Sequence, residues 1–110
     1  MSFKIEASYS FIKELKRLSK KYPSLKSELD TLGTILAENP SFGTPIGKDC
    51  FKIRLAIKSK GKGKSGGARV ITCVLFVKNS VILLSIYDKS ESEDISEAAL
   101  NKILKENDLI

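Results

Sequence analysis

The sequence of 110 residues contains no histidine, no tryptophan and only two cysteines, Cys50 and Cys73. With no histidine and no Cys-x-x-Cys pair, we expect no zinc site. Both cysteines lie in apolar segments, so we expect reduced thiols that fill the core of a cytoplasmic protein. There is no apolar signal segment at the N-terminus and no apolar run long enough to span a bilayer, so we expect no membrane partner.

Acidic residues are scarce in the central part of the chain. Residues 48–87 include nine Lys or Arg and one acid, Asp49, so this part carries a formal charge of +8. Residues 88–110 include seven acids and three lysines, and the whole chain carries +6. Charge concentrated in this way predicts one specific basic face for an anionic partner such as nucleic acid.

Before residue 40, apolar residues recur every three to four positions in two stretches, as on one face of a helix. The first stretch begins near Ser8 and ends at Tyr22, because a residue before proline avoids the helical region. The second begins after Ser24, a capping residue type, and ends at Asn39. The short junction predicts a helical hairpin, and Gly33 is interpreted as a point of close helix–sheet contact. The recurring apolar residues are Phe11, Leu15, Leu18 and Tyr22, and then Leu25, Leu29, Leu32 and Ile35 or Leu36.

Three central segments are rich in Val, Ile, Leu and Phe, which is typical of half-buried strands. They are residues 51–57, 68–77 and 81–87. Residues 78–80 are short enough for a hairpin turn, whereas a longer basic loop, residues 58–67, joins the first two segments. We therefore predict three neighbouring antiparallel strands in a curved sheet.

The flanking segments complete the predicted fold. Residues 3–6 alternate and predict a short strand at the sheet edge, whereas residues 41–50 contain two glycines and a proline and predict a loop. Ser96 is expected to cap a last helix with an apolar stripe of Leu100, Ile103 and Leu104. The order is β-α-α-β-β-β-α, a helical hairpin packed on a small curved antiparallel sheet. This is an α+β fold, expected to be a single domain over residues 1–110.

Basic residues are predicted to share the sheet face that points away from the helical hairpin. If the apolar residues at 51, 53 and 55 face the helices, the alternating residues face the other side. The residues expected there are Lys52, Arg54, Lys58, Arg69, Tyr87 and Lys89. The basic loop adds Lys60, Lys62 and Lys64 between glycines and serines, which suits an extended polyanion because each lysine can neutralise one phosphate. A solvated hairpin end is the alternative interpretation of that loop.

Two apparent motifs are rejected. Gly63-Lys64-Ser65 resembles part of a phosphate-binding P-loop, but Lys58 stands where that motif needs glycine, and a strand follows instead of a helix. Acidic residues before the last helix suggest a divalent-metal site, but acids at a helix N-terminus are ordinary because they complement the helix dipole. Those acids are Asp88, Glu91, Glu93 and Asp94. We therefore expect no metal site.

The stretches FKIRLAIKSKGKGKSGGARVI and LLSIYDKSESEDIS resemble the RelE/ParE toxin superfamily, and most closely its HigB-like branch. In that branch, Gly-Lys-Ser-Gly-Gly-x-Arg-Val is followed by a hairpin that ends in Tyr-x-Lys-x-Glu. The resemblance covers nearly the whole chain, including the Tyr-Pro junction of the helical hairpin. One departure is Thr72-Cys73, where relatives often carry an aromatic residue that bears on codon preference.

This resemblance implies a RelE-like fold and a toxin of a type II toxin–antitoxin system. The implied activity is ribosome-dependent, metal-independent cleavage of mRNA without a cofactor. The implied partners are mRNA on the ribosome and a cognate antitoxin with a helix-turn-helix. Arg69, Tyr87 and Lys89 match family active-site positions, and Arg54 and Lys58 match more loosely. The remaining loop lysines, Lys60, Lys62 and Lys64, are expected to bind RNA.

The residues present are compatible with RNA cleavage by attack of the 2′-OH on the adjacent phosphate. Arg54 and Arg69 can grip phosphate oxygens with their planar forks. Without histidine, proton transfer falls to Tyr87 or to a lysine such as Lys58 or Lys89. Two other functions stay open at this point. One is non-catalytic inhibition of a protein target such as DNA gyrase, and the other is ribosome or RNA binding without chemistry.

Overall fold

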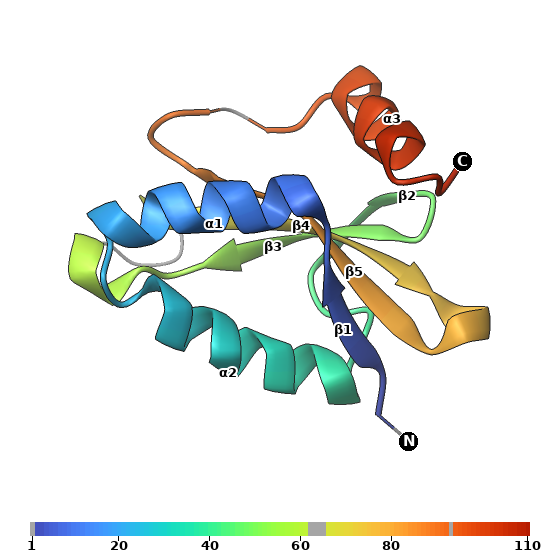
Figure 1. The fold of residues 1–110 in the computed structure, drawn as a ribbon, viewed down its shortest axis with the longest axis horizontal. Coiled ribbons are helices and arrows are strands. Elements are labelled where there is room, and N and C mark those ends of the chain that lie inside the picture. Colours follow the sequence, from blue (N-terminus) through green and yellow to red (C-terminus); the bar gives the residue numbers. More distant parts are fainter. Residues whose placement is uncertain (1, 62–65, 93) are drawn as a thin grey trace.

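The computed structural model describes residues 2–61, 66–92 and 94–110. Predictions for Lys62, Gly63, Lys64, Ser65 and Glu93 fall outside the described residues. The elements in chain order are β1 (Lys4–Ala7), α1 (Tyr9–Lys21), α2 (Leu25–Glu38), β2 (Thr44–Gly47), β3 (Cys50–Leu55), β4 (Ala68–Leu75), β5 (Ser80–Asp88) and α3 (Glu97–Glu106) (Figure 1). Short 3₁₀ turns follow β3 at Lys58–Lys60 and β4 at Phe76–Lys78.

The strands form one sheet in the order β1-β5-β4-β3-β2. Its three central strands are antiparallel neighbours, which confirms the predicted arrangement and the α+β class. The sheet as a whole is mixed rather than antiparallel, because β1 pairs with β5 in parallel at one edge. Parallel pairing requires a long connection, and here the helical hairpin and the other strands supply it.

The predicted loop over residues 41–50 is wrong in its second half, where β2 pairs with the start of β3. Lys48 and Asp49 reverse the chain between these strands, with φ angles of 57° and 58°. Two consecutive residues of positive φ make the tight type I′ hairpin turn, for which Asn-Gly is the usual sequence. Lys-Asp carries no such signal, so the sequence pattern pointed to a loop.

Both predicted N-terminal helices are present. α1 begins after Ser8, whose hydroxyl accepts a hydrogen bond from the Phe11 N–H at 3.1 Å. Ser24 precedes α2, but its hydroxyl makes no capping bond and contacts the Ser59 hydroxyl at 2.8 Å instead. The interpretation of Gly33 as a close contact is wrong, because a side chain there would meet no atom within 4 Å.

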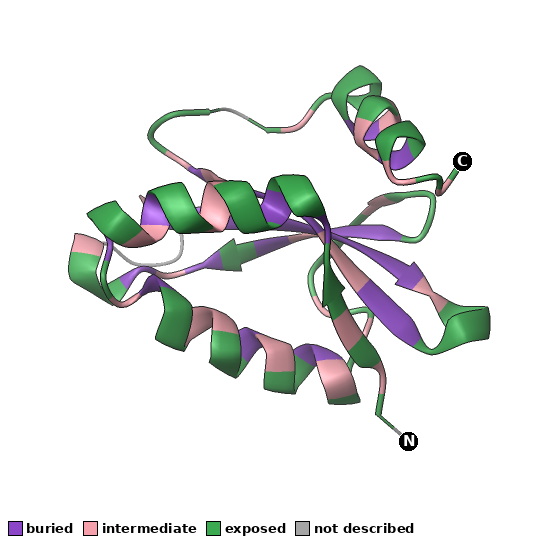
Figure 2. Cartoon of the chain, viewed as in Figure 1, coloured by how far each residue is buried: buried purple, intermediate pink, exposed green. Residues whose placement is uncertain are grey.

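The sheet separates two apolar clusters. On one face, α1 and α2 pack against side chains of β3, β4 and β5. Figure 2 colours the buried positions of these helices and strands purple. On the other face, Leu100 and Leu104 of α3 pack against Cys50, Ile71, Cys73 and Leu84. Ser96 caps α3 as predicted, accepting a hydrogen bond from the Ala99 N–H. Among the described residues, no helix has the length and apolarity needed to cross a bilayer.

A register shift between β4 and β5 interrupts the alternation of β5. The predicted alternation placed Ile82, Leu84 and Ile86 on one face of the sheet. In the structure, Ile82 and Leu84 pack in the cluster under α3, whereas Ile86 packs under α1 and α2. An extra residue in one strand moves every later side chain to the opposite face, and the sequence pattern does not show where this occurs.

Candidate active site

Three of the predicted site residues lie in one row across the central strands. Arg54 of β3 is directly opposite Arg69 of β4, and Arg69 is directly opposite Tyr87 of β5. Residues opposite one another on antiparallel strands have Cβ atoms about 5 Å apart. The neighbours of each along its strand pack under α1 and α2, so these three point to the other face. We call them the cross-strand row.

Two arginines in direct opposition repel each other, so this arrangement favours an anion nearby. Arg54 is exposed, whereas Arg69 is only 3% exposed and donates a hydrogen bond to the Ala68 carbonyl at 3.1 Å. Among the described residues, one anion near the row is Asp94, whose Oδ1 lies 2.8 Å from the Lys52 Nζ. The hydrogen bond from Lys52 lowers the pKa of Asp94, and the charges of Lys89 and Arg69 act in the same direction. The positive charges of Lys52, Lys89 and Arg69 therefore stabilise the ionised form of Asp94.

The Tyr87 hydroxyl is enclosed at the end of the row. It makes no hydrogen bond of normal geometry to the described residues, although the Ile95 backbone lies near enough to lower its pKa slightly. Burial raises the pKa of Tyr87, the charge of Asp94 raises it further, and Arg69 partly offsets both. A phenol with a raised pKa is protonated at neutral pH, so in this state Tyr87 carries a proton that it can donate, although the raised pKa makes it a weaker acid.

Lys89 follows the row at the end of β5. Its N–H donates to the Gly67 carbonyl at 3.0 Å, which joins this turn to the end of the basic loop. A Cβ at Gly67 would lie 2.1 Å from the Leu55 carbonyl oxygen, so only glycine fits this approach to β3. Gly67 thus has a packing role that the sequence did not reveal.

Lys58 lies with Arg54 at the edge of β3 that faces α2. The two residues line a groove of about 310 Å³ between α2 and the edge of β3. The Lys58 N–H donates to the Glu28 carboxylate at 2.6 Å, and the Ser59 N–H donates to the Ser24 hydroxyl at 3.0 Å. The start of the basic loop is therefore attached to the start of α2.

Asp88 anchors the other side of that loop. Its side chain is fully buried and accepts hydrogen bonds from the Tyr22 hydroxyl at 2.6 Å, from the Ser90 N–H at 2.9 Å and from the Lys60 ammonium. Lys60 also lies 5.6 Å from the centre of the Tyr22 ring. The structure thus places the Lys60 ammonium, predicted to contact RNA, in a buried ion pair. Lys62 and Lys64 lie outside the described residues.

Sequence reasoning missed this role of Asp88, although one signal was available. Asp88 follows Ile86 by two positions and therefore points to the same face as a core residue. A carboxylate in that position needs partners, because an unpaired buried charge is strongly unfavourable. Those partners come from segments 66 and 28 residues away in the chain.

The described acids that were considered as a metal site each form an ion pair with a different lysine or arginine. Asp88 pairs with Lys60, Asp94 with Lys52, and Glu91 with Arg17 of α1 at 2.8 Å. Over residues 2–61, 66–92 and 94–110, no three His, Cys, Asp or Glu side chains come close enough together to hold a metal ion. These carboxylates connect the segment after β5 to the rest of the protein.

The protein has an α+β fold with a row of two arginines and a tyrosine across its central strands. Solved structures with the same fold identify the fold class. The sequence matches no protein-family profile. The structure is similar to a double-arginine mutant of the Escherichia coli toxin RelE in the free state, with a TM-score of 0.66 and 20% identity. That match covers 96% of this chain and 98% of the other.

Two further structures show the same fold. The isolated E. coli RelE toxin matches with a TM-score of 0.55 and 22% identity over 96% of this chain and 98% of the other. The intact E. coli RelBE toxin–antitoxin complex matches with a TM-score of 0.56 and 23% identity over 79% of this chain and 96% of the other. The predicted RelE-like fold is confirmed, and the HigB-like branch stays a prediction.

Proposed function

We propose that this protein is the toxin of a type II toxin–antitoxin pair and that it cleaves mRNA on the ribosome without a metal ion. The observation that carries the proposal is the cross-strand row, in which Arg54, Arg69 and Tyr87 are adjacent on three strands. The likeness to RelE toxin structures supports it at the level of fold. A protein that only inhibits another protein has no need for such a row.

In the proposed reaction, the 2′-OH attacks the adjacent phosphorus and the 5′-oxygen leaves. Arg54 and Arg69 hold the phosphate oxygens and stabilise the additional negative charge of the transition state. Tyr87 donates a proton to the leaving oxygen, and Lys89 or Lys58 in its neutral form accepts the 2′-OH proton. The ribosome contributes the alignment of the mRNA, which a small site of this kind supplies only in part.

Access to Arg69 requires movement of the segment after β5. Arg69 and the Tyr87 hydroxyl are both enclosed, and the charge of Asp94 acts on both residues. We propose that RNA displaces Asp94, because a phosphodiester carries the same charge and more acceptor oxygens.

The proposed partner in the resting cell is a cognate antitoxin, in line with the RelBE complex that shares this fold. We propose that it covers the basic face or displaces α3. Charge complementarity would make its association fast and sensitive to salt.

The decisive experiment is primer extension on mRNA after brief induction, comparing the native protein with Tyr87→Phe. We expect cleavage by the variant to fall about 10²-fold, because the proton donor is lost, and growth arrest to be relieved. We expect its melting temperature to be unchanged or slightly raised, because the deleted hydroxyl has no hydrogen-bond partner among the described residues. Full toxicity of the variant at equal expression would remove Tyr87 from the site.

Chelation tests the metal-independent mechanism. We expect cleavage to continue in EDTA when polyamines keep the ribosomes intact. The reason is that Asp88, Glu91 and Asp94, the acids once considered as metal ligands, pair with lysine or arginine. The measurement is cleavage of a defined mRNA on purified ribosomes. Activity that disappears with EDTA and returns with a divalent ion would instead assign a catalytic role to the acids of residues 88–94.

Asp94→Asn tests the proposed competition between this carboxylate and RNA. We expect a short RNA to bind about three- to tenfold more tightly at fixed salt, because one anion is removed from the basic cluster. Folding stability should change little, since the Asp94 side chain is 69% exposed. Glu106→Gln is the matched control with the same change of charge on the exposed part of α3. An equal gain in RNA affinity in both variants would show that the effect comes from net charge and not from the position of Asp94.

A further inference from the structure

The two cysteines face each other across β3 and β4. Cys50 is directly opposite Cys73, and the neighbouring Val74 N–H donates to the Asp49 carbonyl at 2.8 Å. Since hydrogen-bonded and non-hydrogen-bonded pairs alternate along an antiparallel ladder, Cys50 and Cys73 occupy a non-hydrogen-bonded position. There the Cα atoms are about 4.5 Å apart and the side chains are at their closest. This separation lies within the range of about 4.4–6.8 Å that a disulfide requires.

Helix α3 covers this pair of thiols. Cys50 is 1% exposed and Cys73 is 4% exposed, and both belong to the cluster formed with Leu100 and Leu104 of α3. An oxidant in solution therefore reaches them only when this cover opens.

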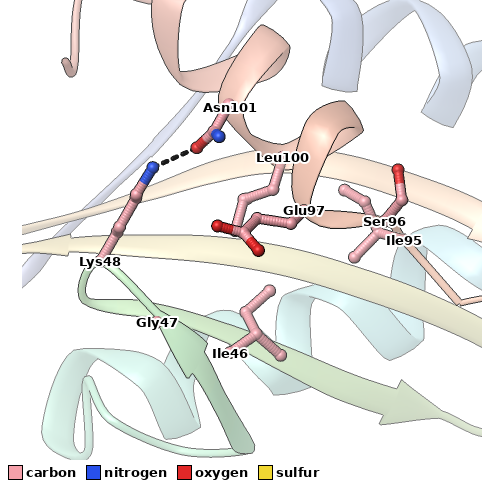
Figure 3. A pocket seen from close by; sticks show the side chains of 8 residues that line it. All are labelled: Ile46, Gly47, Lys48, Ile95, Ser96, Glu97, Leu100 and Asn101. Atoms are coloured by element: carbon pink, nitrogen blue, oxygen red, sulfur yellow. Dashed lines mark hydrogen bonds between the residues drawn. The ribbon is translucent and has the colours of Figure 1, made fainter.

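The cover is incompletely packed against the hairpin that precedes Cys50. A cavity of about 190 Å³ separates the start of α3 from the β2–β3 turn (Figure 3). A hydrogen bond from Lys48 to Asn101 spans this gap, and Leu100 contributes to both the cavity and the thiol cluster. Outward movement of α3 would therefore expose the sulfurs while the sheet stays intact.

We propose that Cys50 and Cys73 form an oxidisable pair that closes to an intramolecular disulfide, with α3 as the cover that limits the rate. This inference does not depend on the proposed nuclease activity. The bond would close the segment that contains Arg54, the basic loop and Arg69, and would thereby tie the two arginine-bearing strands together.

With a peroxide as oxidant, the step balances as follows. The Cys73 thiolate attacks one peroxide oxygen, the O–O bond breaks, and the departing hydroxide is protonated to water, leaving a sulfenic acid. The Cys50 sulfur attacks that sulfenic sulfur, the S–S bond forms, and the second oxygen leaves as water with the Cys50 proton. Both sulfurs together lose two electrons, which the peroxide accepts. The neighbouring Cys50 thiol lowers the pKa of Cys73, which suits Cys73 to react first.

The experiment treats the purified full-length protein with hydrogen peroxide under native conditions. We expect the intact mass to fall by about 2 Da, both thiols to become unreactive to maleimide after denaturation, and dithiothreitol to reverse the change. Cys50→Ser and Cys73→Ser are the controls, in which the remaining thiol gains about 16 or 32 Da instead. The pairing would be overturned if the native protein gained oxygen on each thiol. It would also be overturned if both the native protein and the variants with a loosened α3 stayed reduced.

Three variants test the role of α3 as the cover. Leu104→Ala loosens α3 and should speed disulfide formation about tenfold or more, whereas Leu32→Ala opens the core on the other face and should have a smaller effect. Asn101→Ala removes only the contact with Lys48 and should give a milder increase without loss of folding. Equal acceleration by Leu104→Ala and Leu32→Ala, with none in Asn101→Ala, would show that the thiols open by global unfolding.

Discussion

Arg69→Ala is expected to lower mRNA cleavage about 10²- to 10³-fold and to abolish growth arrest. Removal of one fixed donor from a transition state has effects of this size, and Arg69 is the central residue of the cross-strand row. Its guanidinium is already positioned, because the side chain is 97% enclosed and bonded to the Ala68 carbonyl. The measurement is primer extension on ribosome-bound mRNA at matched expression.

Two further substitutions show whether this effect is specific. Arg69→Lys keeps the charge but loses the planar fork, so we expect it to recover only a small part of the activity. Lys78→Ala removes an exposed cation from the β4–β5 turn and should leave cleavage unchanged. Full activity of a folded Arg69→Ala variant would place the chemistry elsewhere on the protein.

Asp88→Asn is expected to have the largest effect on stability. We expect the free energy of unfolding to fall by about 2–4 kcal/mol, because the Lys60 ammonium loses a buried partner and the Tyr22 and Ser90 hydrogen bonds weaken. Such a loss lowers the melting temperature of a small domain by about 10 °C or more. Glu91→Gln, which breaks the exposed pair with Arg17, is the control and should cost less than about 1 kcal/mol.

The same carboxylate predicts how stability depends on pH. Burial by itself raises the pKa of Asp88, but hydrogen bonds from Lys60, Tyr22 and Ser90 outweigh it and hold the pKa well below its ordinary value. A lowered folded pKa means that the stabilisation is fully present above the unfolded value of about 3.9 and is lost as the pH falls below it. The free energy of unfolding measured with denaturant should therefore fall below about pH 4, and this decline should be smaller in Asp88→Asn. Equal slopes in both proteins would contradict this role for Asp88.

Local patterns were sufficient for the helices, the three central strands and the side of β3 on which Arg54 lies. The helical period placed Phe11 and Leu18 in the core, and the alternation of β3 placed Arg54 on the opposite face from Ile53. Both results depend on spacing within one segment, where a single element fixes the direction of each side chain. The site residues Arg69, Tyr87 and Lys89 came from the family resemblance, and their roles stay predictions.

Other features arise from contacts between segments that no local pattern links. The β2–β3 turn uses a Lys-Asp pair without the usual turn sequence, and the shift in β5 depends on its pairing with β4. Lys60 was predicted from the sequence to bind RNA, yet its ammonium pairs with Asp88, 28 residues away.

By itself, the sequence determined the helices, the first strand, the three central strands and the concentration of positive charge in one central region. Only the tertiary structure decided that Arg54, Arg69 and Tyr87 are in register, that the charge of Asp94 acts on Arg69 and Tyr87, and that Cys50 meets Cys73 beneath α3. The physical reason is that propensity and periodicity act within a segment, whereas strand register and ion pairing are chosen by the packing of segments far apart in the chain.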